Sequence, residues 1–139
     1  MPLPRFHMID DAPQPVATFS HATEVDGWVF LTGQMPTWPG EPDRALPEGI
    51  EAQTRRVMDN LSIVLDGLGL SLQNVVQVRV YITHFDRDYA PMNAVYKGYF
   101  EEDKLPARPE TPRQASCTPV SGGAPKAATV AWYPCQISR

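Results

Sequence analysis

Hydrophobic and polar positions alternate along this chain with two different periods, which divide it into strands and helices. Residues 20–34 predict a β-hairpin, because the turn signal Asp26-Gly27 is followed by the apolar run 28–32. This run is apolar on both of its faces, so we expect both faces to be buried. A short first strand is predicted near residues 6–9.

Two segments show the helical period. Residues 49–67 predict the first helix, and residues 87–100 predict the second. We expect Asp86 or Asp88 to cap the second helix and Pro91 to lie in its first turn. The apolar stripe of the first helix consists of Ile50, Val57, Leu61, Val64, Leu65 and Leu68.

Residues 75–83 alternate with period two, as a strand does. Val76, Val78, Val80 and Ile82 are expected to face one way, and Gln77, Arg79 and Tyr81 the other. Helices should cover the apolar face, and the other face must be polar or meet another subunit.

The tail predicts two more strands. They are expected near residues 114–120 and 127–133, joined by a turn at 121–125. The resulting order is β-β-β-α-β-α-β-β within one domain, residues 1–139. Two helices on one face of a single mixed sheet make a two-layer α+β fold.

Composition narrows the possible functions. The chain has 139 residues and a formal net charge of −4, with its Lys and Arg scattered, which argues against a nucleic-acid partner. No stretch approaches the ~20 apolar residues of a membrane helix, and the start of the chain lacks a signal core. Cys117 and Cys135 form no CxxC pair, so we expect reduced thiols in a cytoplasmic protein.

The sequence calls for neither a metal nor a cofactor. His7, His21 and His84 lie far apart and show no metal-ligand spacing. The sequence therefore predicts no metal site and no cofactor.

Several motifs in the same order resemble the RidA/YjgF family of reactive-intermediate deaminases. Residues 72–86 form a strand leading into a helix whose residues 89–100 follow the pattern (F)xxMNxVYxxYF, and Pro-Ala-Arg follows at 106–108. Upstream, residues 29–36 resemble VFxSGQ(I)P. The resemblance covers roughly residues 13–108.

The resemblance implies a chorismate-mutase-like fold and a homotrimer with a central barrel. It places a ligand cleft between subunits. The reaction it implies is hydrolysis of 2-imino and enamine acids to keto acids and ammonia, without a cofactor. The expected partners are therefore a small carboxylate-bearing substrate and two further copies of the chain, with no membrane.

Two arginines are candidates for the carboxylate anchor. Arg108 matches the arginine of the family's Pro-Ala-Arg motif, and a guanidinium grips a carboxylate through two hydrogen bonds. Because Pro109 and Pro112 interrupt the expected strand, Arg113 is the alternative anchor. Asn93 matches an asparagine that faces the cleft in the family.

The resemblance implies five further site positions. Phe19 stands where the family has a cleft tyrosine, and Thr32-Gly33 match a Ser-Gly pair that approaches the ligand. Cys117 matches a strand cysteine whose carbonyl orients water, and Thr129 falls near the family's proton-handling glutamate. No Asp or Glu follows position 110. Each position also has a structural interpretation, such as a surface arginine, a helix-surface amide, a strand-end bulge or a small buried thiol.

Two other functions stay open. One is a pathway-specific deaminase or hydrolase for an aminomuconate-like unsaturated acid, a planar ligand that Trp28, Trp38 and Trp132 would suit. The other is a trimer that binds a small carboxylate without turnover.

Overall fold

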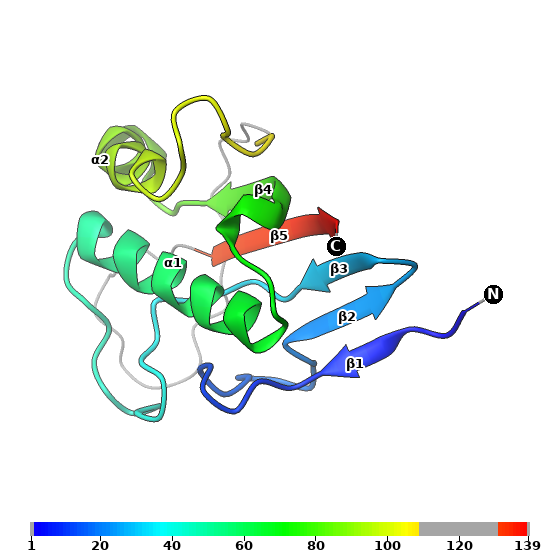
Figure 1. Ribbon diagram of the computed structural model, residues 1–139. Helices are drawn as coiled ribbons and strands as arrows, with labels where there is room; N and C mark the ends of the chain where they lie inside the picture. The colour runs from blue at the N-terminus through cyan, green and yellow to red at the C-terminus, as the bar shows by residue number, and fades with distance from the viewer. Residues whose placement is uncertain (1, 109–130, 139) are drawn as a thin grey trace.

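Five strands and two α-helices make up the part of the chain that the computed structural model describes, residues 2–108 with the backbone of 131–138. The sheet has the order β1-β2-β3-β5-β4, and its named strands pair antiparallel (Figure 1). The elements are β1 (Arg5–His7), β2 (Ala22–Val25), β3 (Trp28–Leu31), α1 (Ile50–Gly67), the 3-10 helix η1 (Leu72–Asn74), β4 (Val75–Tyr81), α2 (Phe85–Lys97) and β5 (Ala131–Ser138).

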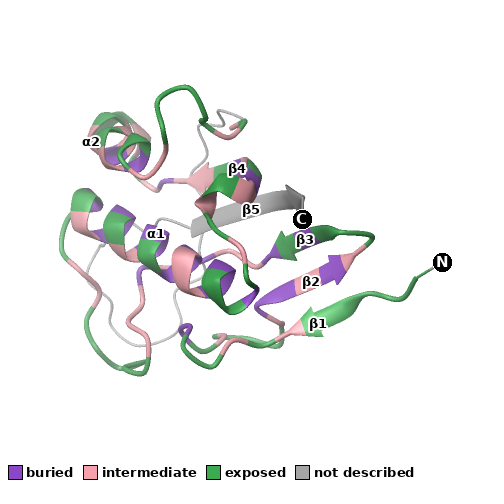
Figure 2. Cartoon of the chain, viewed as in Figure 1, coloured by how far each residue is buried: buried purple, intermediate pink, exposed green. Residues whose placement is uncertain are grey.

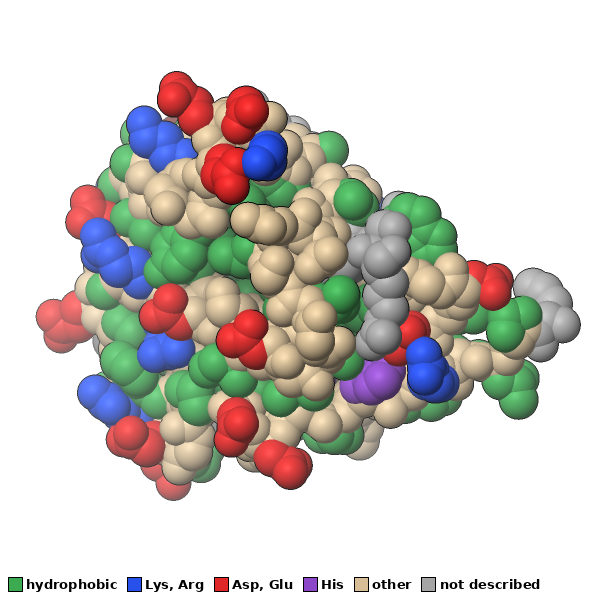
Figure 3. Space-filling view, viewed as in Figure 1, with side chains coloured by type: hydrophobic (Ala, Val, Ile, Leu, Met, Phe, Trp, Pro, Cys, Tyr) green, Lys and Arg blue, Asp and Glu red, His purple; other side chains and the backbone are tan. Residues whose placement is uncertain are grey.

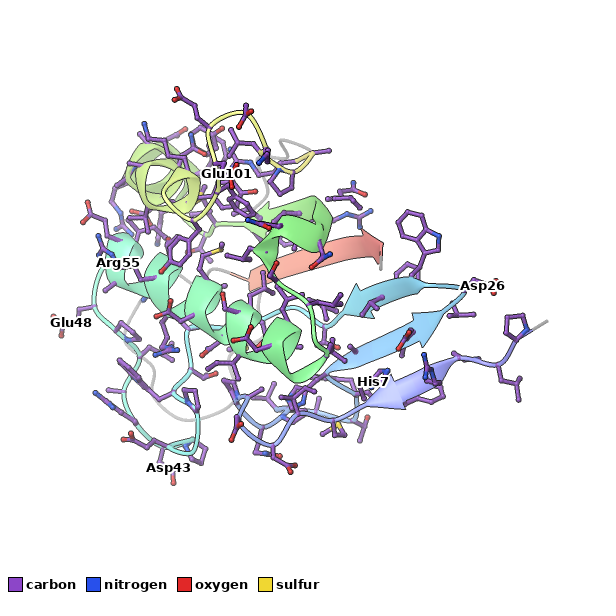
Figure 4. The ribbon with its side chains drawn as sticks, in the orientation of Figure 1. His7, Asp26, Asp43, Glu48, Arg55 and Glu101 are labelled. Carbon is purple, nitrogen blue, oxygen red and sulfur yellow. The ribbon has the colours of Figure 1, made fainter. Side chains whose placement is uncertain are left out.

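The predicted hairpin is confirmed. Asp26 and Gly27 have φ values of 52° and 76°, as a two-residue turn that follows the strand twist requires. Asp26 lies at the tip of the hairpin (Figure 4). The expectation that the strand after the turn is buried on both faces is wrong for a single chain, because Trp28 and Phe30 are 42% and 37% exposed.

A β-bulge alters the expected faces of β4. The pairing with β5 shifts register between Val75 and Gln77 and again before Val78. An extra residue in one strand reverses the side-chain alternation beyond it. Val78 is therefore fully buried, as expected, while Val76 is 41% exposed, which corrects its assignment to the core face.

The first helix begins and ends close to the predicted residues. Its whole apolar stripe is buried. At its end, Leu70 N donates to Leu65 O and Gly69, at φ 71°, donates to Asp66 O, the pattern of a Schellman motif. A side chain at Gly67 would come within 2.7 Å of Ile9, so this glycine permits a close approach of the first loop.

The second helix starts earlier than predicted, and this changes two expectations. Its N-cap is His84, without a side-chain cap, so neither Asp86 nor Asp88 caps it. Asp88 is instead buried within the helix and receives two hydrogen bonds of 2.7 Å from Arg87. Pro91 lies inside the helix, in its second turn rather than its first.

Both helices cover the same face of the sheet. Their buried residues form one core with those of β3 and β4 (Figures 1 and 2). No element of the described part of the chain covers the other face. Thr23 pairs with both Phe6 and Phe30, so these two rings share that open face.

The tail is described only in part. The predicted strand at 114–120 and the turn at 121–125 lie outside the described residues. The strand predicted at 127–133 overlaps β5, which continues to Ser138 rather than ending at 133. No helix in the described part of the chain is long and apolar enough to cross a membrane.

Candidate functional site

Arg108 is placed by a short backbone pairing with β4. Val78 N donates to Ala107 O at 2.9 Å, and Ala107 N donates to Val76 O at 3.0 Å. The bridge between Gln77 and Ala107 is parallel. Arg108 therefore emerges at the β4 edge of the sheet, beside α2.

Three side chains of α2 surround the guanidinium of Arg108. Its Nη2 donates to Asn93 Oδ1 at 2.7 Å and to Tyr89 Oη at 3.3 Å. Its Cζ lies 4.8 Å from the ring centroid of Tyr96 and 5.8 Å from that of Tyr89. Because these helix residues recur at i, i+4 and i+7, they share one face of α2.

The other terminal nitrogen of Arg108 has no hydrogen-bond partner among the described residues. Nη1 is buried and makes no hydrogen bond to any residue of the described ranges. A guanidinium is always charged in proteins, and a buried donor left unpaired is costly. Such a donor is typical of a site that an anionic ligand completes.

The described surroundings of Arg108 leave its charge unbalanced. Burial raises the pKa of Tyr96 to about 12, an effect that the nearby Arg108 cation partly offsets. The phenol is therefore neutral at physiological pH. No carboxylate of the described part of the chain pairs with Arg108. The site is thus locally positive and suits a carboxylate.

A second group of predicted residues lies near β3, in the middle of the sheet order. Phe19 and Gly33 line a small pocket of about 30 Å³, whose apolar wall also includes Val16 and Met35. Thr32 lies beside the pocket, where its Oγ1 donates to Ser20 O at 2.6 Å. This pocket offers an apolar wall rather than a charged anchor.

His21 lines the pocket as a neutral group. Its Nδ1 accepts a hydrogen bond from Ile9 N at 2.8 Å, so the ring proton sits on Nε2. Nε2 then donates to Pro13 O at 2.9 Å. Both ring nitrogens are engaged in hydrogen bonds. His21 therefore stabilises the loop between Ile9 and Pro13 and is not available as a general base.

One chain does not bring the two groups together. Thr32 directly follows β3, and β5, β4 and the segment holding Arg108 lie beyond β3 in that order. Three strand spacings of ~4.8 Å put roughly 14 Å between the two groups. That distance exceeds the length of a small keto or imino acid.

The described residues include only part of the predicted site. It brings Arg108 and Asn93 together and places Phe19, Thr32 and Gly33 near a separate pocket. The remaining predicted positions, Arg113, Cys117 and Thr129, lie outside the described residues. The sequence analysis did not predict the contact of Tyr89 with Arg108. Tyr89 lies four residues before Asn93, and this helical spacing could have indicated that both side chains face the same site.

The buried carboxylate of Glu24 has a structural role. Glu24 is buried on β2. Its Oε1 accepts a hydrogen bond from Arg5 Nη2 at 2.7 Å, and its Oε2 lies 3.0 Å from His7 Nε2. These contacts hold β1 on the sheet. Within the described part of the chain, no three His, Cys, Asp or Glu side chains gather as metal ligands would.

Comparisons with known proteins agree with one another. A family model described as endoribonuclease L-PSP matches residues 9–113. A RutC family protein of Pyrococcus abyssi is 40% identical over 99 residues, which cover 71% of this chain and 76% of that protein. The crystal structure of RidA from an Antarctic Psychrobacter is 28% identical with a TM-score of 0.77, covering 96% of this chain and 98% of that one. YyfA from Yersinia pestis, of the conserved Rid protein family and of unknown function, is 26% identical with a TM-score of 0.81 and covers 99% and 100%.

Proposed function

The chain belongs to the endoribonuclease L-PSP family, which includes RidA/YjgF, and on this premise we propose that it hydrolyses 2-imino and enamine acids to keto acids and ammonia. The observation that carries the proposal is the Arg108 guanidinium. It is fixed through Nη2, its Nη1 is buried and unpartnered within the described chain, and no carboxylate there neutralises it.

The chemistry asks little of the protein. Arg108 grips the carboxylate and holds the substrate beside a water molecule, which makes the attack effectively unimolecular. An enamine first tautomerises to the imine by protonation at carbon. Water then adds to the carbon of the protonated imine, and the resulting carbinolamine loses ammonia to leave the keto acid. Because no Asp or Glu follows position 110, the protons pass through solvent in this scheme.

We propose that the complete site forms between copies of the chain in a homotrimer. Two observations support this assembly. Arg108 and the Phe19 pocket are too far apart in one chain to hold the same small ligand. The open sheet face also exposes apolar side chains that a neighbouring subunit would cover, among them Phe6, Trp28 and Phe30.

RNA cleavage, which the family description names, has less support. Acidic and basic side chains are interspersed on the face shown in Figure 3, without a continuous basic patch. The net charge of −4 also repels a polyanion.

A coupled assay tests the proposal. A dehydratase releases 2-aminoacrylate from serine, and the formation of pyruvate is followed with lactate dehydrogenase. We expect the wild-type protein to accelerate pyruvate release and Arg108→Ala to lose at least about tenfold of that rate, since a charged hydrogen bond of about 1.5–3 kcal/mol is lost. The matched control is Arg55→Ala, an exposed arginine at the start of α1 (Figure 4), which should keep the wild-type rate.

Two results would reject imine hydrolysis at this site. One is a wild-type rate no faster than that of buffer. The other is an Arg108→Ala variant as active as wild type. Saturable turnover of a larger unsaturated amino acid, with none of 2-aminoacrylate, would instead favour the pathway-specific enzyme.

A further inference from the structure

Both N–H groups of Arg108 Nη2 are already used within the chain. One bonds Asn93 Oδ1 at 2.7 Å, and the other bonds Tyr89 Oη at 3.3 Å. Nη1, in contrast, is buried without a partner in the described ranges. Among the described residues, therefore, only Nη1 of the two terminal nitrogens still has N–H groups available for a carboxylate.

This occupancy conflicts with a two-bond grip on a carboxylate. A guanidinium binds a carboxylate through two parallel N–H groups along one edge. One such edge pairs Nη1 with Nη2, and the other pairs Nε with Nη2. Both edges include Nη2, so a two-bond grip needs an N–H that now bonds Asn93 or Tyr89.

The contact with Tyr89 is the weaker of the two. It is 0.6 Å longer than the contact with Asn93, from the difference between 3.3 and 2.7 Å. A carboxylate is also a stronger acceptor than a neutral phenol oxygen, because charged acceptors roughly double the strength of a hydrogen bond. A substrate carboxylate would therefore displace Tyr89 and leave Asn93 in place.

We propose that the hydroxyl of Tyr89 is a placeholder for the substrate carboxylate on Arg108 Nη2. In the free protein the hydroxyl accepts a hydrogen bond from Arg108 Nη2. When a carboxylate binds, the carboxylate takes over this hydrogen bond, so the strength of the contact with Tyr89 sets the affinity for carboxylate ligands. This inference rests on the proposed function, in which Arg108 is the anchor. Tyr89 is then a specificity-determining residue that competes with the ligand.

The packing of the ring allows the hydroxyl to be removed alone. Tyr89 stacks on Phe85 with ring centroids 4.6 Å apart, a contact that phenylalanine would keep. The ring also stays near Arg108, at 5.8 Å from Cζ. Tyr89→Phe thus removes the acceptor that competes for Arg108 Nη2 and keeps the aromatic ring. Its position is also the one where the family pattern has phenylalanine.

The direction of the effect distinguishes a placeholder from a structural role. The probe is pyruvate, the product of 2-aminoacrylate hydrolysis, titrated by calorimetry. Tyr89→Phe should lower the Kd of pyruvate about 3- to 10-fold, the effect of one competing hydrogen bond. The KM for 2-aminoacrylate should fall by a similar factor. A merely structural tyrosine would leave affinity unchanged or weaken it.

Two further variants complete the experiment. Tyr99→Phe is the matched control, because it removes a phenol that bonds Asp59 away from Arg108, and its Kd should equal that of wild type. Tyr89→Leu is the second variant without the hydroxyl, and it should also bind pyruvate more tightly. Thermal unfolding confirms that each variant is folded.

The outcomes separate this inference from the proposed function. If Arg108→Ala abolishes pyruvate binding while Tyr89→Phe leaves the Kd unchanged or raises it, the anchor stands and the placeholder is overturned. If Arg108→Ala binds pyruvate as tightly as wild type, the anchor is wrong and both proposals are rejected.

Discussion

Asn93 accepts a hydrogen bond of 2.7 Å from Arg108, fifteen positions further along the chain. The contact ties the middle of α2 to the segment that pairs with β4. Because the amide is neutral, it orients the guanidinium without cancelling its charge. A carboxylate at the same place would orient the arginine equally well and would remove the positive charge that an anionic substrate needs.

Asn93→Asp should therefore weaken carboxylate binding strongly while keeping the fold. At a separation of about 4 Å and an effective dielectric constant of about 20, two unit charges interact by about 4 kcal/mol. We expect the Kd of pyruvate to rise at least tenfold in Asn93→Asp, and to rise less in Asn93→Ala. Calorimetry measures both values. Wild-type affinity in the aspartate variant would contradict the idea that Arg108 provides uncompensated charge.

Sequence periodicity predicted the elements that pack locally. The apolar stripe of α1 and the Asp26-Gly27 turn depend on near neighbours, and both are present in the structure. The bulge that exposes Val76 depends on pairing between β4 and β5, which are at least fifty positions apart in the sequence. Such tertiary pairing leaves little trace in a strand's own alternation.

For the candidate site as well, the sequence predicted the local features but not those that depend on tertiary pairing. The resemblance named Arg108 and Asn93, but the sequence did not show that Tyr89 reaches the same nitrogen. Helical spacing places Tyr89 and Asn93 on one face, whereas the position of Arg108 follows from the backbone pairing of Ala107 with β4. The roughly 14 Å between the two predicted groups also emerges only from the strand order.

Asn60 should be among the most important polar side chains for stability. It is fully buried on α1, and its Nδ2 donates to Met35 O at 2.9 Å and to Thr37 O at 2.8 Å. Asn60→Ala leaves both carbonyls without this partner and should cost about 2–4 kcal/mol in the free energy of unfolding, measured with urea. Gln73→Ala, an exposed amide on η1, should change it by less than about 0.5 kcal/mol. Equal stabilities of the two variants would show that the loop does not depend on Asn60.

Tyr96 should make stability depend on pH at the alkaline end. Burial raises its pKa in the folded protein to about 12 from the ordinary value of 10.0 for a tyrosine. The folded state therefore holds this proton more tightly than the unfolded chain does. The resulting stabilisation is fully present below about pH 10 and is lost as pH rises towards 12.

Urea unfolding between pH 9 and 11.5 measures this loss. The wild-type free energy of unfolding should fall more steeply with pH than that of Tyr96→Phe, which has no phenol to ionise. Identical slopes would mean that the phenol ionises alike in both states. In Arg108→Ala the pKa of Tyr96 should rise further, because the cation that lowers it is gone.

Phe30 should decide whether the chain assembles. It is 37% exposed in a single chain and shares the open sheet face with Phe6, on the side away from the helices. Phe30→Lys places a charge on a surface that we propose neighbouring subunits cover, and burying an unpaired charge is costly. Light scattering should give a trimer mass for wild type and a monomer mass for this variant.

Gln73→Lys, on the exposed η1, should remain trimeric and control for the added charge. Because the two halves of the site come from different copies in our proposal, Phe30→Lys should also lose turnover of 2-aminoacrylate. A folded monomer with full activity would show that one chain alone completes the site.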